Sequence, residues 1–76
     1  MKKSEFLVYT YRYTWKNSEG KLCVKFIVGA DIEHKKFMQK LIDAPEVVLA
    51  SRIYVNTIDC SMLEQHEIIK KEVLKK

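Results

Sequence analysis

Two segments near the start of the chain alternate between apolar and polar residues with the period of a β-strand. Residues 5–16 are rich in Phe, Val, Tyr, Thr and Trp, and residues 21–29 alternate Leu, Val, Phe and Val with Cys, Lys and Ile. Between them, residues 17–20 read Asn-Ser-Glu-Gly, all of which are common in turns. The pattern predicts a β-hairpin.

The register of this hairpin depends on the length of its loop. A four-residue loop, residues 17–20, opposes Tyr13 to Val24 and places the aromatic and apolar rows on one face. A three-residue loop would instead oppose Arg12 to Phe26 and mix the faces. Because a shift of one residue moves every side chain to the other side of the sheet, burial favours the four-residue loop. The opposite face is then half polar and carries Val8, Thr10, Arg12, Thr14, Cys23, Lys25 and Ile27.

A helical period follows over residues 31–43. Asp31 suits the N-cap, Glu33 is favourable in the first turn, and Pro45 ends the segment because the residue before a proline avoids the α region. The apolar stripe of this helix is expected to cover one face of the sheet. Its members are His34, Phe37, Met38, Leu41 and Ile42.

The rest of the chain predicts a third strand and a second helix. Residues 53–58 are rich in β-branched and aromatic types, so a third strand is expected over about 52–58. Residues 46–51, which are apolar at 47–50, are either an extension of that strand or a bulged lead-in. Ser-Met-Leu-Glu at positions 61–64 has the form of a capping box, so a helix is expected over 61–75, with Ile68 exposed. The sequence predicts one small α+β domain over residues 1–76. Its order is β-β-α-β-α, with a three-stranded antiparallel sheet in order 2-1-3 packed on one or two helices.

Charge and cysteine content narrow the picture. The net charge is +4, twelve of the fourteen basic residues are Lys, and residues 1–30 hold six basic against two acidic side chains. Lys reads bases less specifically than Arg does. Two cysteines are too few for a disulfide-stapled secreted scaffold, and no apolar run approaches the ~18 residues that a membrane span needs. We therefore expect a cytoplasmic protein with two reduced thiols.

The sequence offers no pattern typical of an enzyme or a cofactor site. With only Gly20 and Gly29 present, neither a P-loop nor a dinucleotide fingerprint can be written. Both histidines fall on predicted apolar stripes, where a packed core histidine is the simpler interpretation. No knuckle spacing typical of zinc occurs, so we expect no catalytic residues, no cofactor and no metal. The residues of suitable type for zinc are Cys23, His34, Cys60 and His66.

Surplus apolar surface favours a protein-interaction module. One face of a three-stranded sheet would stay uncovered, and the last helix would carry apolar residues on more than one side. The edge at residues 21–29 is also a site for strand addition, although Lys25 discourages casual pairing. We predict a non-enzymatic protein-binding module, expected to be homodimeric, with Arg12 and Tyr54 as its leading contacts. The predicted partner-binding residues are Thr10, Arg12, Thr14, Lys25, Ile27, Tyr54, Ile68 and Leu74.

The alternative function is nonspecific nucleic-acid binding by the basic hairpin. An aromatic row amid cations is typical of sheets on which bases stack. The competing interpretation is that this row is the core under helix 31–43, which leaves the lysines on the other face. That row consists of Tyr9, Tyr11, Tyr13 and Trp15.

In its size, its Lys- and Ile-rich composition and its motif-free β-β-α-β-α order, the chain resembles small proteins encoded by phages and other mobile elements. Many of those proteins bind and block a host protein, and anti-defence inhibitors are among them. The resemblance implies a modulator or inhibitor of a host protein. It assigns no role to any single residue.

Overall fold

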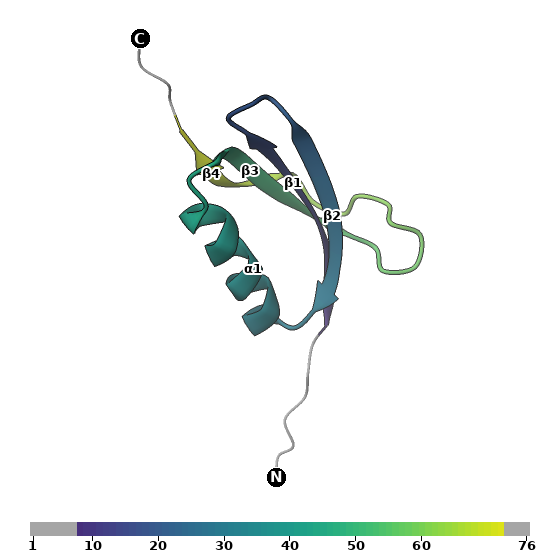
Figure 1. The fold of residues 1–76 in the computed structure, drawn as a ribbon. Helices are drawn as coiled ribbons and strands as arrows, with labels where there is room; N and C mark the ends of the chain where they lie inside the picture. The colour runs from purple at the N-terminus through teal and green to yellow at the C-terminus, as the bar shows by residue number, and fades with distance from the viewer. Residues whose placement is uncertain (1–7, 73–76) are drawn as a thin grey trace.

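The computed structural model describes residues 8–72, in which one helix lies across one face of a four-stranded antiparallel sheet (Figure 1). The sheet order is β2-β1-β3-β4. The α+β class and the 2-1-3 arrangement are confirmed, and a fourth strand extends the sheet beyond β3. The elements are β1 (Tyr9–Asn17), β2 (Leu22–Gly29), α1 (Asp31–Asp43), β3 (Val47–Val55) and β4 (Glu67–Lys71).

The hairpin of β1 and β2 has the register that the sequence interpretation rejected. Arg12 lies opposite Phe26, so the loop has three residues, and the prediction of a four-residue loop is wrong. The Gly20 amide donates to the Asn17 carbonyl at 2.8 Å, and Gly20 has a left-handed φ of 89°. A bond from the fourth residue of a turn to the first, with a left-handed glycine at the fourth position, is typical of a common three-residue hairpin loop. The observed turn matches this register and not the one with a four-residue loop.

The corrected register exchanges the faces of β2. Cys23, Lys25 and Ile27 lie on the same side of the sheet as the aromatic row of β1, facing α1, because Tyr13 is opposite Lys25. They are therefore not part of an uncovered face, as the sequence interpretation expected. The four apolar residues of β2 that were expected in the core lie on the other side. They are Leu22, Val24, Phe26 and Val28.

The main core lies between α1 and the sheet. Tyr13 and Leu41 are buried there, and Phe37 packs edge-on against Tyr13, with ring centroids 4.8 Å apart. The predicted bounds of α1 and its role in covering the aromatic row are confirmed. Asp31 is not the N-cap, however. Ala30 is the N-cap, because its carbonyl accepts the amides of Glu33 and His34. No side chain caps this end of the helix.

The third strand begins earlier and ends sooner than residues 52–58. β3 runs from Val47 to Val55, so the apolar segment before position 52 is an extension of the strand. The strand stops before Asn56, whose side-chain Oδ1 accepts the Ile58 amide at 2.7 Å. A side chain that bonds to the backbone two residues ahead forms a turn and stops the ladder.

The predicted helix over 61–75 is wrong within the described residues. Residues 61–66 complete a long connection, and residues 67–71 form β4 against the free edge of β3. Ile69 reaches the core, while the Lys70 ammonium donates to the Ala44 carbonyl at 2.9 Å and closes the end of α1. Two adjacent β-branched isoleucines suit a strand better than a helix once an edge is available. Leu74 lies outside the described residues.

The turn of the hairpin gives a first test. A Cβ added at Gly20 would meet nothing within 4 Å, so Gly20→Ala changes only the backbone preference. We expect it to lower the free energy of unfolding by about 1 kcal/mol, because L-residues are strained in the left-handed region. Gly20→Asn should cost less, since Asn tolerates that conformation. Urea unfolding of the three proteins measures the difference. Equal stabilities would show that the turn is not left-handed.

Candidate partner-binding surface

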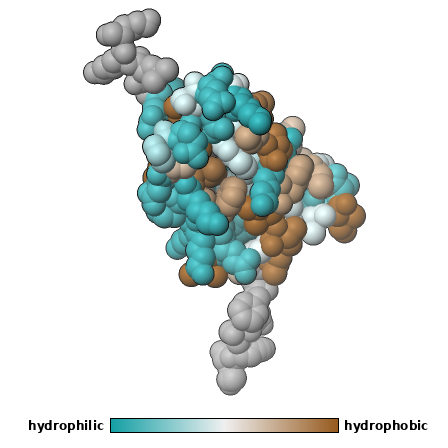
Figure 2. Space-filling model, in the orientation of Figure 1, coloured by the Kyte–Doolittle hydropathy of each residue, from teal (hydrophilic) through white to brown (hydrophobic). Residues whose placement is uncertain are grey.

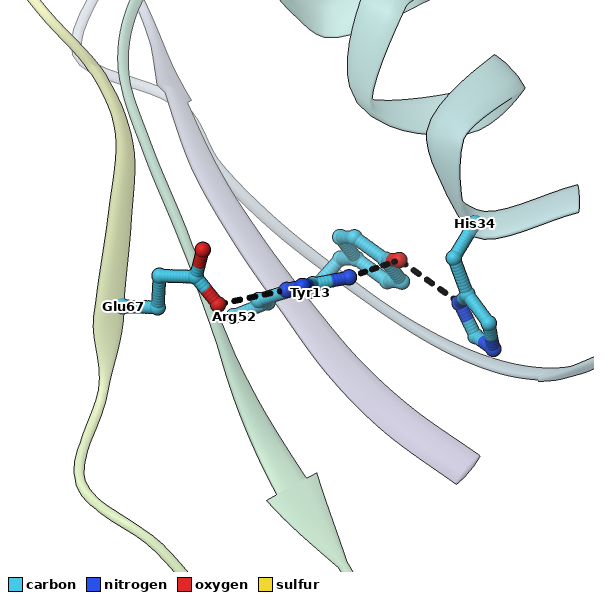
Figure 3. A network of polar contacts seen from close by, with 4 residues as sticks. All are labelled: Tyr13, His34, Arg52 and Glu67. Atoms are coloured by element: carbon cyan, nitrogen blue, oxygen red, sulfur yellow. Dashed lines mark hydrogen bonds and ion pairs between the residues drawn. The ribbon is translucent and has the colours of Figure 1, made fainter. Parts of the chain in front are cut away.

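A chain of polar contacts crosses the α1 side of the sheet and ends inside the core (Figure 3). Arg52 on β3 donates from Nε to Glu67 on β4 at 2.9 Å, and from Nη1 to the Tyr13 hydroxyl at 3.4 Å. The Tyr13 oxygen is 2.7 Å from Nδ1 of His34. His34 lies on the sheet-facing side of α1 and is completely buried. The other ring nitrogen of His34 is 3.0 Å from the Tyr9 carbonyl. This series of polar contacts therefore connects all the helices and strands of the fold except β2.

The donors in this chain follow from its acceptors. A carbonyl can only accept, so Nε2 of His34 donates to the Tyr9 carbonyl. The Tyr13 hydroxyl accepts from Arg52, which leaves its own hydrogen to be donated to Nδ1 of His34. Burial raises the pKa of the Tyr13 hydroxyl above its ordinary 10.0, although the hydrogen bond from Arg52 acts against this. Burial acts to lower the pKa of Arg52, but its bonds to Tyr13 and Glu67 raise that pKa overall. Each of these buried groups has a partner, so the chain explains how α1 is held on the sheet.

The opposite face of the sheet is covered over only part of its area. The connection between β3 and β4, residues 56–66, folds across it and buries Ile53 and Val55. The Thr10 hydroxyl bonds to that of Thr57 at 2.9 Å, and Arg12 Nη2 lies 3.4 Å from Nε2 of His66. A shallow depression of about 670 Å³ opens above this contact. It is lined by Ile53, Met62, Leu63, Glu64, Gln65 and His66.

The rest of that face is open, and its largest apolar feature runs along β2. We call Leu22, Val24, Phe26 and Val28 the β2 row. These side chains are 47–63% exposed, and the neighbouring Val8 is exposed as well. Hydrophobic side chains gather on the side of the molecule where β2 and the 56–66 connection lie (Figure 2). The β2 row is the strongest candidate for a binding surface.

The structure separates most of the partner-binding residues predicted from the sequence. Thr10 is buried and Arg12 half-buried beneath the 56–66 connection, and Thr14 is half-buried near the middle of the open face. Ile68 is 59% exposed on the same face, but on β4 rather than a helix. The others face α1: Lys25 near the Phe37 ring, Ile27 against the core and Tyr54 beside Tyr9 and Tyr11.

The β2 row was missed because parity placed it in the core. The signal that could have found it is the loop itself. Asn17 followed three residues later by Gly20 is the sequence form of a type I turn with a left-handed residue after it. Given that loop, Phe26 must lie opposite Arg12 and outside the core.

The residues considered for metal or thiol chemistry lie apart. Cys23 and Cys60 are free thiols, the first half-buried on β2 and the second exposed at a left-handed turn position. His34 is in the core, and His66 is exposed. Between residues 8 and 72, no group of three His, Cys, Asp or Glu side chains is arranged to hold a metal ion. In the same range, α1 is too short to cross a membrane.

Comparison with protein-family models, curated proteins and solved structures found no match for this chain. The surface must therefore be interpreted from its own chemistry.

The hydrogen bonds that link Arg52, Tyr13 and His34 predict that removing the Tyr13 hydroxyl lowers stability. Tyr13→Phe removes the hydroxyl that donates to buried His34 and accepts from Arg52. We expect the free energy of unfolding to fall by about 1–3 kcal/mol, the usual cost of leaving a buried polar group without a partner. Tyr54→Phe is the matched control, because its hydroxyl makes no hydrogen bond within the described residues; we expect a change below about 0.5 kcal/mol. Equal losses in chemical denaturation would contradict this role for Tyr13.

The tyrosines also predict how stability depends on high pH. Burial raises the pKa of both Tyr11 and Tyr13 above 10.0. A pKa that is higher in the folded than in the unfolded state stabilises the fold below the unfolded value, and this contribution is lost as pH rises through the folded value. We therefore expect the contribution of these two tyrosines to stability to be constant up to about pH 10 and to be lost above it. Absorbance at 295 nm should show a late-ionising component in the folded protein that is absent after unfolding in urea and that shrinks in Tyr11→Phe and in Tyr13→Phe. A late component that neither substitution changes would contradict the burial of these two hydroxyls.

Proposed function

We propose that this chain is a small, non-enzymatic protein-binding module that contacts its partner through the β2 row. The observation that carries the proposal is the exposure of four apolar side chains at alternate positions of one strand, all on one face. Together they expose on the order of 400 Å² of apolar surface, a size at which patches on monomeric proteins are often functional.

Two features make this surface more than incidental exposure. The 56–66 connection covers Ile53 and Val55 on the same face and stops short of β2, so a covering element is present but leaves the row open. The centre of the row is Phe26, and aromatic side chains are enriched among the residues that dominate binding energies. A partner that covers the row would remove this apolar surface from water.

The biological role that we propose is modulation or inhibition of a host protein in the cytoplasm, as expected for small proteins of phages and mobile elements. A module of this kind needs a stable surface and no catalytic group. The homodimer expected from the sequence stays a prediction.

Nucleic-acid binding remains the alternative. Its stacking platform would be the aromatic row of β1, but α1 buries Tyr13 and half-buries Tyr11 and Trp15. Binding would then rest on cations such as Lys16 and Lys21, which supply salt-sensitive, nonspecific affinity. The geometry therefore supports the protein partner better.

Photocrosslinking tests the proposal at contact distance. A benzoylphenylalanine at position 26, in the β2 row, should form a protease-sensitive adduct in an extract of the source cells. The same group at position 32, on α1, is the matched control, because Ile32 is exposed away from the row. Adding Val24→Glu should abolish the adduct at position 26, because it places a charge in the contact, whereas Ile32→Glu should not.

Adducts of equal yield at positions 26 and 32, or an adduct that survives Val24→Glu, would overturn the proposed surface. An adduct sensitive to nuclease instead of protease would favour nucleic-acid binding. Circular dichroism of each variant confirms that a lost adduct reflects a lost contact rather than unfolding.

A further inference from the structure

At the sheet edge formed by β2, the backbone groups that bond to no other residue within 8–72 belong to the same residues as the β2 row. The Asn17 amide donates to the Lys21 carbonyl at 2.9 Å, so these two residues form a hydrogen-bonded pair. Hydrogen-bonded and non-hydrogen-bonded pairs alternate along an antiparallel ladder. Cys23, Lys25 and Ile27 therefore bond to β1, and the residues between them point their N–H and C=O groups outward. The edge thus offers both backbone bonds and apolar side chains at Leu22, Val24, Phe26 and Val28.

The other edge of the sheet lacks these properties. β4 has five residues, and its pairing with β3 is interrupted by a register shift between Ala50 and Ser51. Three of its five residues are charged. Short, charged and bulged edges are the usual protection against added strands. β2 has eight residues and an uninterrupted ladder with β1, so it is better suited than β4 to pair with an added strand.

One charge interrupts the β2 edge, and it lies on the α1 side. Lys25 is exposed, with its ammonium 5.9 Å from the centre of the Phe37 ring. Within residues 8–72 the ion pairs are Arg52–Glu67 and Lys70–Glu72, so no carboxylate there neutralises Lys25. Residues 21–30 contain no Asp or Glu. An added strand would place one of its side chains opposite this ammonium.

The Lys25 charge makes a second copy of this chain less favourable at the β2 edge than a strand from a different protein. In a pair of two copies related by a twofold axis at Lys25, Leu22 would face Val28 and Val24 would face Phe26, which pairs the whole row. The same register sets Lys25 opposite the Lys25 of the second copy, and like charges directly opposite are destabilising. Shifting the register by two residues separates the ammonium groups but leaves either Leu22 or Val28, depending on the direction of the shift, outside the pairing of the row. The net charge of +4 on each copy opposes association further.

We propose that the β2 edge binds an extended segment of an acidic partner protein, which adds as a fifth strand. Its alternate apolar side chains lie beside the β2 row, and a carboxylate between them lies opposite Lys25. This inference rests on the proposed protein-binding function and names the partner's chemistry. Cross-strand pairs of opposite charge are favourable, so a carboxylate opposite Lys25 would make its ammonium group a favourable contact for the added strand.

Two synthetic peptides test the charge preference. One is Val-Thr-Val-Glu-Val-Thr-Val and the other has Lys in place of Glu, both blocked at their ends. We expect the Glu peptide to bind the full chain roughly threefold to tenfold more tightly, the range for exchanging a like-charge for an opposite-charge cross-strand pair. Lys25→Glu should reverse the order of the two peptides, and Lys36→Glu on α1 is the control that should leave it unchanged. Isothermal titration at low ionic strength measures all six affinities.

Amide hydrogen exchange tests the geometry. In the free protein the amides of the β2 row should exchange fast, and those of Cys23, Lys25 and Ile27 slowly. With the Glu peptide present, the amides of the row should become protected too. Binding without this new protection would overturn strand addition.

Equal affinities, or an order that Lys25→Glu does not change, would overturn the acidic partner. Protection of the row that grows with protein concentration and needs no peptide would show that a second copy is the occupant. Each of these results leaves the crosslinking test at position 26 standing. Loss of site-specific crosslinking there would instead remove the proposed function itself.

Discussion

The left-handed backbone at Gly20 is the constraint on which the rest of the molecule depends. It closes the hairpin with three residues between paired strands, and this loop places Phe26 opposite Arg12. One residue more in the loop would turn the β2 row towards α1 and leave Lys25 on the other face. The three-residue loop therefore goes together with Lys25 and Ile27 facing the helix and the β2 row facing away from it.

The core is small as a result, and polar contacts complete it. β2 contributes Ile27 to the α1 side, while the aromatic residues of β1 fill most of the space under the helix. His34 is fully buried there and is satisfied on both ring nitrogens by Tyr13 and Tyr9. A buried network with every member bonded fixes a single arrangement of helix and sheet. In this arrangement no element within residues 8–72 covers the apolar residues of β2.

Local signals were sufficient to predict part of the fold. Helix 31–43 was predicted with its observed bounds, because an apolar stripe and Pro45 define it within one segment. The strands of the hairpin and the 2-1-3 order also followed from the pattern of residues. The position of residues 67–71 could not be predicted in this way. Ile68 and Ile69 form a strand only because β3 offers a free edge about 20 residues away, and no local pattern records that edge.

The candidate site was harder to predict than the fold, because an error of one residue in register assigns every side chain of a strand to the wrong face. Thr10 and Lys25 were assigned to one free face, yet one is buried under the 56–66 connection and the other lies on the α1 side. Ile68 was correctly expected to be exposed, although on a helix. Burial favoured the wrong hairpin because that argument assumes a chain that covers its own apolar residues. This chain leaves a row of them exposed and so does not meet that assumption.

The register of the hairpin can be measured directly by proton NMR. Non-hydrogen-bonded antiparallel pairs bring their Hα atoms close together. The structure predicts Hα–Hα nuclear Overhauser effects between Arg12 and Phe26 and between Thr14 and Val24. Effects between Tyr13 and Val24, in the register with a four-residue loop, would place the β2 row in the core and contradict the account of this surface.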